Sequence, residues 1–532
     1  MRTAVTRAAL VSLWVLGVSA CGSDVDDGAF TAPPPAANSY TVGGTVTGLN
    51  DGATLVLQNN GGNNLSLTAN GAFTFSNAVM SGTAYNVTVA TQPTGQTCAI
   101  SNGSGTIGSA NVTNVVVSCT PQVGKFLYVP NAGSNNVSTY SVDASTGALT
   151  EIAGSPFAAD RSPSLATADP AGQILYVINQ GSPSTPPRIS SYAIGANGAL
   201  TQNLQSPVPV SVPPPPNGAA LFNKPIVHRS GQFLYVTNVD NGILYGASAD
   251  ATGILTQLPD TPRRIGDSVG FGEFDAAGSF LYVPHDSVGF TAGAGGVAIF
   301  QVNPLSGVLT SLGEVATNAS RPTMATLTPS GKFLLVAHAS STPASGPGRV
   351  AVFAVDTAGM LTAVAGSPFA TGGVTTFVVA HPTKNFVYAN SAMAPGNVSS
   401  IVAFQIDPNS GVLTPIAGSP FATGGNNASV IRIDASGRFL YVANRDSSSI
   451  AGFAIDQTTG ALAAVPGSPT ITDAAPLVTI DPSGRYLYST NSGTGANTIA
   501  SYAIHPTTGT PTLVNKLATG ITPVAVEIVG RQ

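Results

Sequence analysis

The sequence is poor in charged residues, cysteine and tryptophan, and its low charge narrows the range of molecules that it can bind. Only 8% of the 532 residues are Asp, Glu, Lys or Arg, and the formal net charge is −5 with no basic cluster. This distribution gives no electrostatic basis for binding nucleic acid. The sequence also lacks the HExxH, CxxC and P-loop patterns and any ordered series of Ca²⁺ ligands. We therefore expect no metal ion and no other cofactor.

The N-terminus has a short apolar run that follows positive charges, and this run is too short to span a bilayer. Residues 1–20 contain two arginines, the apolar run and small residues directly before Cys21, as in a secretory signal peptide. The sequence Val18-Ser19-Ala20-Cys21 resembles the bacterial lipobox, which implies membrane attachment through a lipid on Cys21. Gly22 in place of Asp implies the outer membrane, facing either the periplasm or the cell surface. An ordinary signal peptide followed by an incidental cysteine is the alternative.

Two segments of different pattern follow the signal peptide. Residues 21–38 are acidic and rich in proline, with little to bury, so we expect a tether. Residues 39–120 alternate apolar and polar residues between Asn- and Gly-rich turns, which is typical of a small antiparallel β-sandwich. By this pattern the segment resembles the Ig-like modules of bacterial surface lipoproteins. Cys98 and Cys119 form an even pair in an exported chain and predict one disulfide.

The rest of the chain, residues 124–532, repeats one strand motif. Eight copies of Phe-Leu-Tyr-Val or a variant, about 47 to 59 residues apart, predict a propeller or a solenoid. Each repeat has four strand signals separated by turn sequences, as a propeller blade does. Residues 522–529 match an inner strand with nothing after it, and we expect them to complete the first blade. The sequence therefore predicts an all-β protein with an eight-bladed propeller, seven blades being the alternative.

Three motifs of the repeats resemble those of the lactonase-type propellers, the 6-phosphogluconolactonase-like family. They are Gly-Arg-Phe-Leu-Tyr-Val-Ala-Asn at 437–444, Asp-Pro-Ser-Gly-Arg at 481–485 and Asp-Pro-Asn-Ser-Gly-Val-Leu-Thr at 407–414. The resemblance implies a propeller that is typically seven-bladed. It also implies hydrolysis of a lactone by His, Arg and Glu side chains in the central channel.

Four residues are candidates for such a catalytic site. His285 and His338 end the second strands of their blades, on the face with the variable loops, where the other blades have asparagine. Glu273 lies in the fourth inner strand, and Arg321 precedes the fifth. A histidine base, an arginine for an oxyanion or carboxylate and a glutamate for proton transfer would suffice for lactone hydrolysis. The alternative for both histidines is a turn-capping role.

Two functions fit these observations. The favoured hypothesis is a non-catalytic lipoprotein whose propeller binds a glycan, a protein or an envelope polymer, because asparagine dominates the positions after the second strands. The alternative is an exported lactonase that acts on a sugar lactone or a related cyclic ester. The alternative requires the four candidate residues to meet on one substrate.

Overall fold

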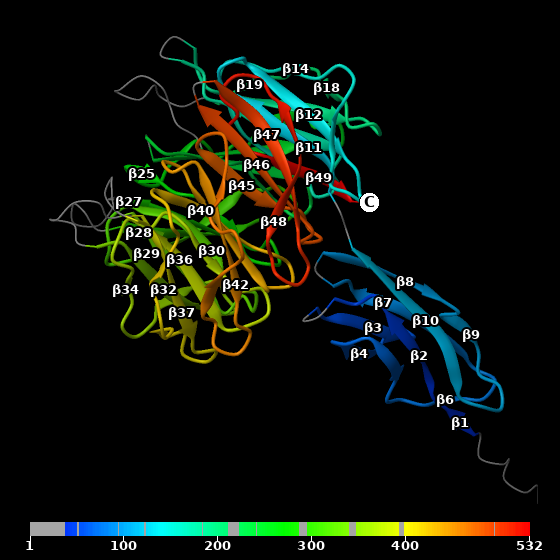
Figure 1. The fold of residues 1–532 in the computed structure, drawn as a ribbon. Coiled ribbons are helices and arrows are strands. Elements are labelled where there is room, and N and C mark those ends of the chain that lie inside the picture. Colours follow the sequence, from blue (N-terminus) through cyan, green and yellow to red (C-terminus); the bar gives the residue numbers. More distant parts are fainter. Residues whose placement is uncertain are drawn as a thin grey trace, which may run out of the picture.

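The computed structural model describes residues 38–531, apart from residues 51–52, 94, 122–123, 183–184, 211–222, 241, 287–294, 340–346, 393–397 and 494. The predicted signal peptide, Cys21 and all of the predicted tether except residue 38 lie outside the described residues. The described residues form strands and turns, and none of them belongs to a helix that is long and apolar enough to cross a membrane. Figure 1 shows a small two-sheet body, drawn in blue, and a larger ring of sheets coloured from cyan to red.

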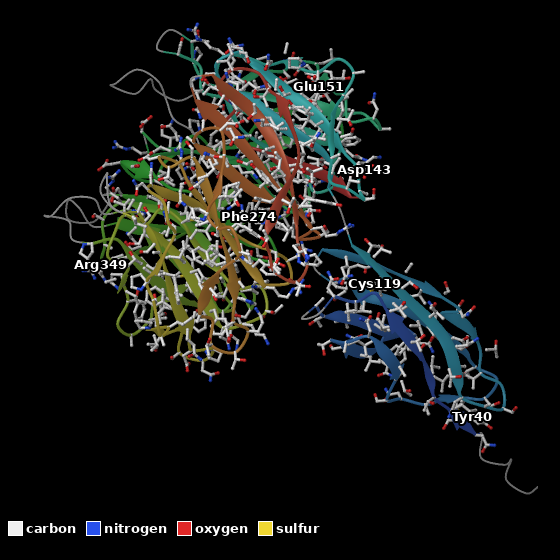
Figure 2. All side chains as sticks on the ribbon, viewed as in Figure 1. Tyr40, Cys119, Asp143, Glu151, Phe274 and Arg349 are labelled. Atoms are coloured by element: carbon white, nitrogen blue, oxygen red, sulfur yellow. A yellow bond between two sulfur atoms is a disulfide. The ribbon has the colours of Figure 1, made fainter. Side chains whose placement is uncertain are left out.

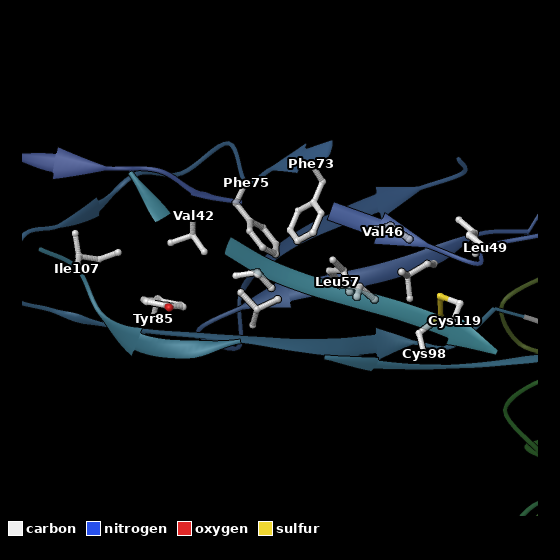
Figure 3. Close-up of a cluster of buried hydrophobic side chains, with 14 residues drawn as sticks. Val42, Val46, Leu49, Leu57, Phe73, Phe75, Tyr85, Cys98, Ile107 and Cys119 are labelled. Atoms are coloured by element: carbon white, nitrogen blue, oxygen red, sulfur yellow. A yellow bond between two sulfur atoms is a disulfide. The ribbon is translucent and has the colours of Figure 1, made fainter. Parts of the chain in front are cut away.

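The small body consists of two four-stranded sheets that enclose one hydrophobic core. The first sheet has the strand order β5 (Gly71–Thr74), β2 (Val42–Thr47), β10 (Val112–Pro121), β8 (Gln96–Ser101). The second has the order β4 (Asn63–Leu67), β3 (Leu55–Asn59), β7 (Ala84–Thr91), β9 (Ser104–Thr106), and β1 (Ser39–Tyr40) pairs with β6 (Val79–Met80). Alternate side chains such as Leu57, Phe73 and Phe75 fill the space between the sheets (Figure 3).

The pairing within this sandwich differs in one respect from the expected antiparallel pattern. β10 runs parallel to β2, with Val117 opposite Val46. A tight hairpin forces antiparallel pairing, whereas two strands separated by a long stretch of chain are free to pair in parallel. The predicted disulfide is confirmed, because Cys98 on β8 and Cys119 on β10 are opposite each other and bonded. The Ig-like identity of the module stays a prediction.

The larger body contains eight sheets of at least four strands, so the predicted count of eight blades is confirmed. The inner strands are β49 (Glu527–Arg531), β15 (Pro163–Ala168), β20 (Ile226–Val227), β25 (Ser268–Val269) with β26 (Glu273–Phe274), β30 (Pro322–Leu327), β35 (Val378–Ala380), β40 (Ala428–Ile433) and β45 (Pro476–Ile480). The second strands, which carry the repeated motif, are β11 (Gly124–Asn131), β16 (Ile174–Asn179), β21 (Phe233–Asn238), β27 (Phe280–Asp286), β31 (Phe333–His338), β36 (Phe386–Ser391), β41 (Phe439–Asn444) and β46 (Tyr486–Gly493).

The two outer strands of each blade follow in the same order around the ring. The third strands are β12 (Asn136–Val142), β17 (Arg188–Ile194), β22 (Ile243–Ala249), β28 (Gly295–Val302), β32 (Arg349–Val355), β37 (Ser400–Ile406), β42 (Ser449–Ile455) and β47 (Ala496–Ile504). The fourth are β13 (Leu149–Glu151), β18 (Leu200–Gln202), β23 (Leu255–Gln257), β29 (Leu309–Ala316), β33 (Leu361–Ala363), β38 (Leu413–Pro415), β43 (Leu462–Ala464) and β48 (Pro511–Ala518).

The outer edge has a period of four blades. In blades one to three and five to seven the fourth strand is three residues long, and a separate two-residue strand also pairs with the third strand. These two-residue strands are β14 (Phe157–Ala158), β19 (Val208–Pro209), β24 (Arg263–Arg264), β34 (Phe369–Ala370), β39 (Phe421–Ala422) and β44 (Thr470–Ile471). In blades four and eight one strand of eight residues, β29 or β48, takes their place. This longer strand brings Glu314 of blade four close to the site considered below.

The repeated motif explains why the blades stack. All four motif residues of β41 are buried, and the hydroxyl of Tyr441 donates a hydrogen bond of 2.6 Å to the carbonyl of Gly509 in the next blade. The same bond joins Tyr128 to Gly198, Tyr235 to Gly307, Tyr282 to Gly359 and Tyr388 to Gly460. The C-terminal strand β49 pairs with β11, as predicted, and so closes the ring by hydrogen bonds between the two ends of the propeller.

Candidate functional site in the central channel

The inner strands surround a cavity of about 580 Å³ to which all eight blades contribute. This volume is in the usual range for sites that bind small molecules. Three of its lining residues, Glu273, Arg432 and Thr479, belong to a set that the pairing register defines. In every blade one inner-strand residue is opposite the third residue of the Phe-Leu-Tyr-Val motif. We call these eight residues the polar ring: Thr167, Ile226, Glu273, Thr326, Val379, Arg432, Thr479 and Glu527.

A second ring lies two residues earlier along the chain, about 7 Å away along the strands. Alternate residues of a strand point to the same side, so the two rings have side chains of the same orientation. We call this second set the apolar ring, and all of its members line the cavity: Leu165, Lys224, Phe271, Met324, Phe377, Val430, Leu477 and Ala525. Each inner strand starts on the face with the variable loops, so the apolar ring is nearer to that face and the polar ring is deeper.

Glu273 is the predicted site residue that lines this channel. Its Oε2 accepts a hydrogen bond of 3.1 Å from the backbone N–H of Leu327, and it also interacts with the side chain of Thr326. Burial raises the pKa of its carboxyl to about 7, and these two hydrogen bonds oppose the rise. A carboxyl with this pKa is partly protonated near neutral pH, as a general base or acid requires.

Glu527 occupies the equivalent position in blade one and has a different charge environment. Its Oε1 accepts a hydrogen bond of 3.1 Å from the backbone N–H of Ala168, which matches the bond between Glu273 and Leu327. Its Oε2, however, forms an ion pair with Nζ of Lys224 at 2.8 Å. The two glutamates therefore connect neighbouring blades in the same way, but Glu527 is neutralised by a cation.

Arg432 is a functional candidate that the sequence analysis missed. It belongs to the polar ring in blade seven, lines the same cavity as Glu273, and donates from Nη1 to the carbonyl of Ile431 at 3.0 Å. Burial lowers the pKa of its guanidinium and the charge of Glu527 opposes this, but an arginine stays cationic in water-accessible sites. The signal was present in the sequence, because Arg432 interrupts the apolar run of its inner strand just as Glu273 does.

The two candidate histidines are fully buried at the ends of β27 and β31. Nε2 of His285 is 3.2 Å from Oε2 of Glu314, which the long strand β29 provides. Burial lowers the pKa of His285, although Glu314 opposes this, and burial lowers the pKa of His338 to about 4. His338 is thus neutral near pH 7, and its Nδ1 is 3.1 Å from the carbonyl oxygen of Ser320.

The segment Ser320–Arg321 connects the surroundings of the two histidines. The backbone N–H of Arg321 donates a 3.0 Å hydrogen bond to Asp286, the residue after His285, while the carbonyl of Ser320 contacts His338. The Arg321 side chain is exposed. Glu273 is opposite Tyr282, which is three residues before His285 on β27. Three residues of a strand span about 10 Å, so Glu273 lies about that far along the strand direction from His285. The structure therefore groups His285, Arg321 and His338 near the junction of blades four and five, while Glu273 lies deeper, in the channel.

The asparagines at the ends of the second strands are buried in the same way as the histidines. Asn390, for example, is fully buried, accepts hydrogen bonds from the backbone N–H groups of Thr376 and Phe377, and donates to the carbonyl of Ala428. These contacts join the inner strand of its own blade to that of the next. Buried side chains that satisfy backbone groups in this way stabilise the scaffold.

Residues 266–270 read Gly-Asp-Ser-Val-Gly, which matches a GxSxG pattern. In nucleophile-elbow enzymes this pattern forms a sharp turn between a strand and a helix. Here Ser268 is in strand β25, opposite Asp286, and the neighbouring Val269 is opposite His285. Adjacent strand positions point to opposite faces, so Ser268 and His285 do not face each other. The pattern is not a nucleophile elbow.

A ring of eight four-stranded sheets around a channel defines a β-propeller. The sequence profile of the family described as "Lactonase, 7-bladed beta-propeller" matches residues 117–214, 233–367 and 416–528, and the chain belongs to this family. The gap between residues 367 and 416 contains β35 to β38, a whole blade. The matched segments contain the other seven blades, except for β20, the inner strand of blade three, the short strand β34 of blade five and the last residues of β49.

Two solved structures show the same fold at low sequence identity. The periplasmic gluconolactonase PpgL of Pseudomonas aeruginosa is 18% identical, with a TM-score of 0.50, and the match covers 76% of this chain and 99% of that protein. The dihydro-heme d1 dehydrogenase NirN is 14% identical, with a TM-score of 0.51 and coverage of 76% and 75%. No curated protein sequence gives a match. Proteins named for different reactions thus share this fold, so function has to be argued from the channel.

Proposed function

We propose that this protein is a lactonase-type hydrolase that takes a small cyclic ester into its central channel. The observation that supports this most strongly is the cavity that Glu273 and Arg432 both line, one with a pKa of about 7 and one cationic. Hydrolysis of an ester needs a base to activate water and a positive group to stabilise the oxyanion. The polar ring provides one residue of each kind.

The reaction then proceeds in two steps. The Glu273 carboxylate takes a proton from a water molecule as the water oxygen attacks the lactone carbonyl carbon, and Arg432 stabilises the negative charge that develops on the carbonyl oxygen. When the tetrahedral intermediate collapses, the bond to the ring oxygen breaks, and Glu273 returns its proton to the departing alkoxide. The product is the open hydroxy acid, whose carboxyl group releases its proton to water, and the resulting carboxylate remains opposite Arg432. The earlier hypothesis that His285, Arg321 and His338 share this substrate stays a prediction.

Binding without turnover is the second candidate, and it is the function that the sequence favoured. Its support is that the Glu273 carboxylate already accepts hydrogen bonds from blade five, while both histidines are buried beside Glu314 and Ser320. In this case the protein is an interaction scaffold at the cell envelope and holds its ligand, a glycan, protein or lactone, unchanged. Lactone hydrolysis separates the two candidates.

Export and membrane attachment belong to the proposal for either function. Residues 1–21 support a lipid anchor on Cys21 in the outer membrane, and the disulfide between Cys98 and Cys119 is of the kind that forms in oxidising compartments. Labelling of cells with a radioactive fatty acid tests the anchor: the wild-type protein is expected to incorporate label, and the Cys21→Ala variant is not. Equal labelling of the two would refute the anchor at this residue.

The test of catalysis uses the soluble chain from Gly22 with a panel of sugar and alkyl lactones. We expect hydrolysis, a loss of at least 100-fold in kcat/KM in Glu273→Gln, which is typical of a lost general base, and a comparable loss in Arg432→Gln. Glu151→Gln is the matched control, because Glu151 is exposed at the edge of blade one (Figure 2). Absence of turnover above buffer would refute the hydrolase and leave binding without turnover.

A further inference from the structure

The two rings of the channel have opposite character, and this difference bears on the type of ligand. Seven of the eight residues of the apolar ring are hydrocarbon, aromatic or thioether side chains, and the eighth, Lys224, forms its ion pair with Glu527. In the polar ring, the three residues that line the cavity, Glu273, Arg432 and Thr479, each carry a charge or a hydroxyl group. A ligand that extends along the channel therefore meets a polar region and an apolar region in succession.

We infer that the ligand is amphiphilic, a cyclic ester with an alkyl or acyl substituent: the ester ring lies at the polar ring, and the substituent lies within the apolar ring. The assignment of the head group rests on the proposed lactone chemistry, whereas the position of the apolar tail rests on the cavity alone. The apolar ring is on the side of the variable loops. A ligand from that face therefore enters with its ester ring first, and its substituent stays nearer to the entrance.

The side chains that line the tail region favour this class over a polyhydroxylated sugar lactone. Phe271, Met324 and Phe377 come from three consecutive blades, and Val430 and Leu477 extend the apolar surface through the next two. None of these side chains offers a strong hydrogen-bond donor or acceptor. Thr376, Asn427, Ser429 and Arg445 also line the cavity, but sugar hydroxyl groups packed against the five apolar side chains would lose their bonds to water without replacement, which is unfavourable. A methylene chain, in contrast, gains from leaving water.

The size of the effect follows from the burial of methylene groups. Each CH₂ that moves from water into an apolar cavity improves binding about fourfold. For δ-lactones with chains of two, four and six carbons, kcat/KM is expected to rise about fourfold per methylene until the ring is filled. The corresponding lactams, which resist hydrolysis, are expected to show the same trend in Kd by calorimetry.

The test compares these lactones and lactams with gluconolactone on wild type, Phe377→Ser, Met324→Gln and a control. Leu305→Ser is the matched control, because Leu305 is 91% exposed in the turn between β28 and β29, so its loss of an apolar side chain leaves the channel untouched. Phe377→Ser and Met324→Gln are expected to reduce the dependence on chain length, to about twofold per methylene or less, while Leu305→Ser keeps it. Circular dichroism and thermal melting confirm that each variant is folded.

The outcomes distinguish this inference from the proposed function. Hydrolysis of gluconolactone at a rate equal to or above that of the alkyl lactones would overturn the inference and leave the hydrolase in place. Lactam binding that strengthens with chain length, but without hydrolysis of any lactone, would support the amphiphilic site and refute the hydrolase. Chain-length dependence that is the same in Phe377→Ser as in wild type would also overturn the inference, because the tail would then lie elsewhere.

Discussion

The titration of Glu273 gives the most specific prediction about the channel. Burial raises the pKa of its carboxyl to about 7 in the folded protein, compared with an ordinary value of 4.5. Between these values the folded state binds the proton more tightly than the unfolded state does, so the free energy of unfolding falls as the pH rises from about 5 to about 8. Replacement by glutamine mimics the protonated form at every pH and removes this contribution.

The size of the effect follows from the shift. A difference of about 2.5 pKa units corresponds to about 3 kcal/mol, and water in the channel reaches part of the side chain and reduces this value. We expect the stability of Glu273→Gln, relative to wild type, to increase by about 1 to 3 kcal/mol between pH 5 and pH 8. Any change in the hydrogen bonds to Leu327 and Thr326 that is independent of pH cancels in this comparison.

The assay is denaturant unfolding of wild type, Glu273→Gln and the exposed control Glu151→Gln at several pH values. If Glu273 is also the general base, kcat/KM for a lactone rises with pH and levels off above an inflection near pH 7. The reasoning is refuted if wild type and Glu273→Gln show the same dependence of stability on pH. It is also refuted if Glu151→Gln shows the pH-dependent gain.

Three further predictions concern the scaffold. Tyr441→Phe leaves the carbonyl of Gly509 without its 2.6 Å hydrogen bond and is expected to lower the free energy of unfolding in denaturant by about 1 to 3 kcal/mol. Tyr488→Phe is the control, because the Tyr488 hydroxyl has no hydrogen-bond partner in the described part of the chain. Equal losses in the two variants would contradict the role of the inter-blade bond. Replacing Cys98 and Cys119 with serine removes a disulfide between residues 21 positions apart and is expected to lower the free energy of unfolding of residues 39–120 by about 3 kcal/mol. We expect faster proteolysis of residues 39–120 but not of the propeller. Equal protease sensitivity of both bodies would contradict independent folding. Gly437→Ala is expected to destabilise the protein more than Gly467→Ala. Both positions have φ near +75°, but the new Cβ at 437 would lie 2.2 Å from the His381 ring, whereas that at 467 meets nothing within 4 Å. Similar unfolding midpoints for the two variants would show that the contact is easily relieved.

The repeats made the architecture predictable from the sequence, because each blade has its own copy of the motif. Eight copies gave eight blades, and residues 522–529 at the end of the chain indicated how the ring closes. The pair Cys98 and Cys119 was predictable for a different reason, since these are the only two cysteines besides Cys21. The parallel pairing of β10 with β2 was not predictable, because alternation shows which residues are buried but not which strands are neighbours.

The channel was only partly predictable, and the reason is the register of the inner strands. Glu273 was recognised as a charge in an apolar run, but Arg432, which fits the same description, was missed. A shift of one residue turns a side chain from one side of a strand to the other. The pairing of β40 with β41 contains such an irregularity between Ala428 and Ile431, so the orientation of Arg432 required the structure. Likewise, only the fold shows that Glu314 reaches His285 across blade four.

The most direct test of the account is a crystal structure of the Glu273→Gln variant with an alkyl-substituted δ-lactam. The account predicts electron density in the central channel, with the lactam carbonyl within hydrogen-bond distance of Arg432 and the alkyl chain between Phe271, Met324 and Phe377. An empty channel in crystals that bind the lactam at the variable loops would contradict it.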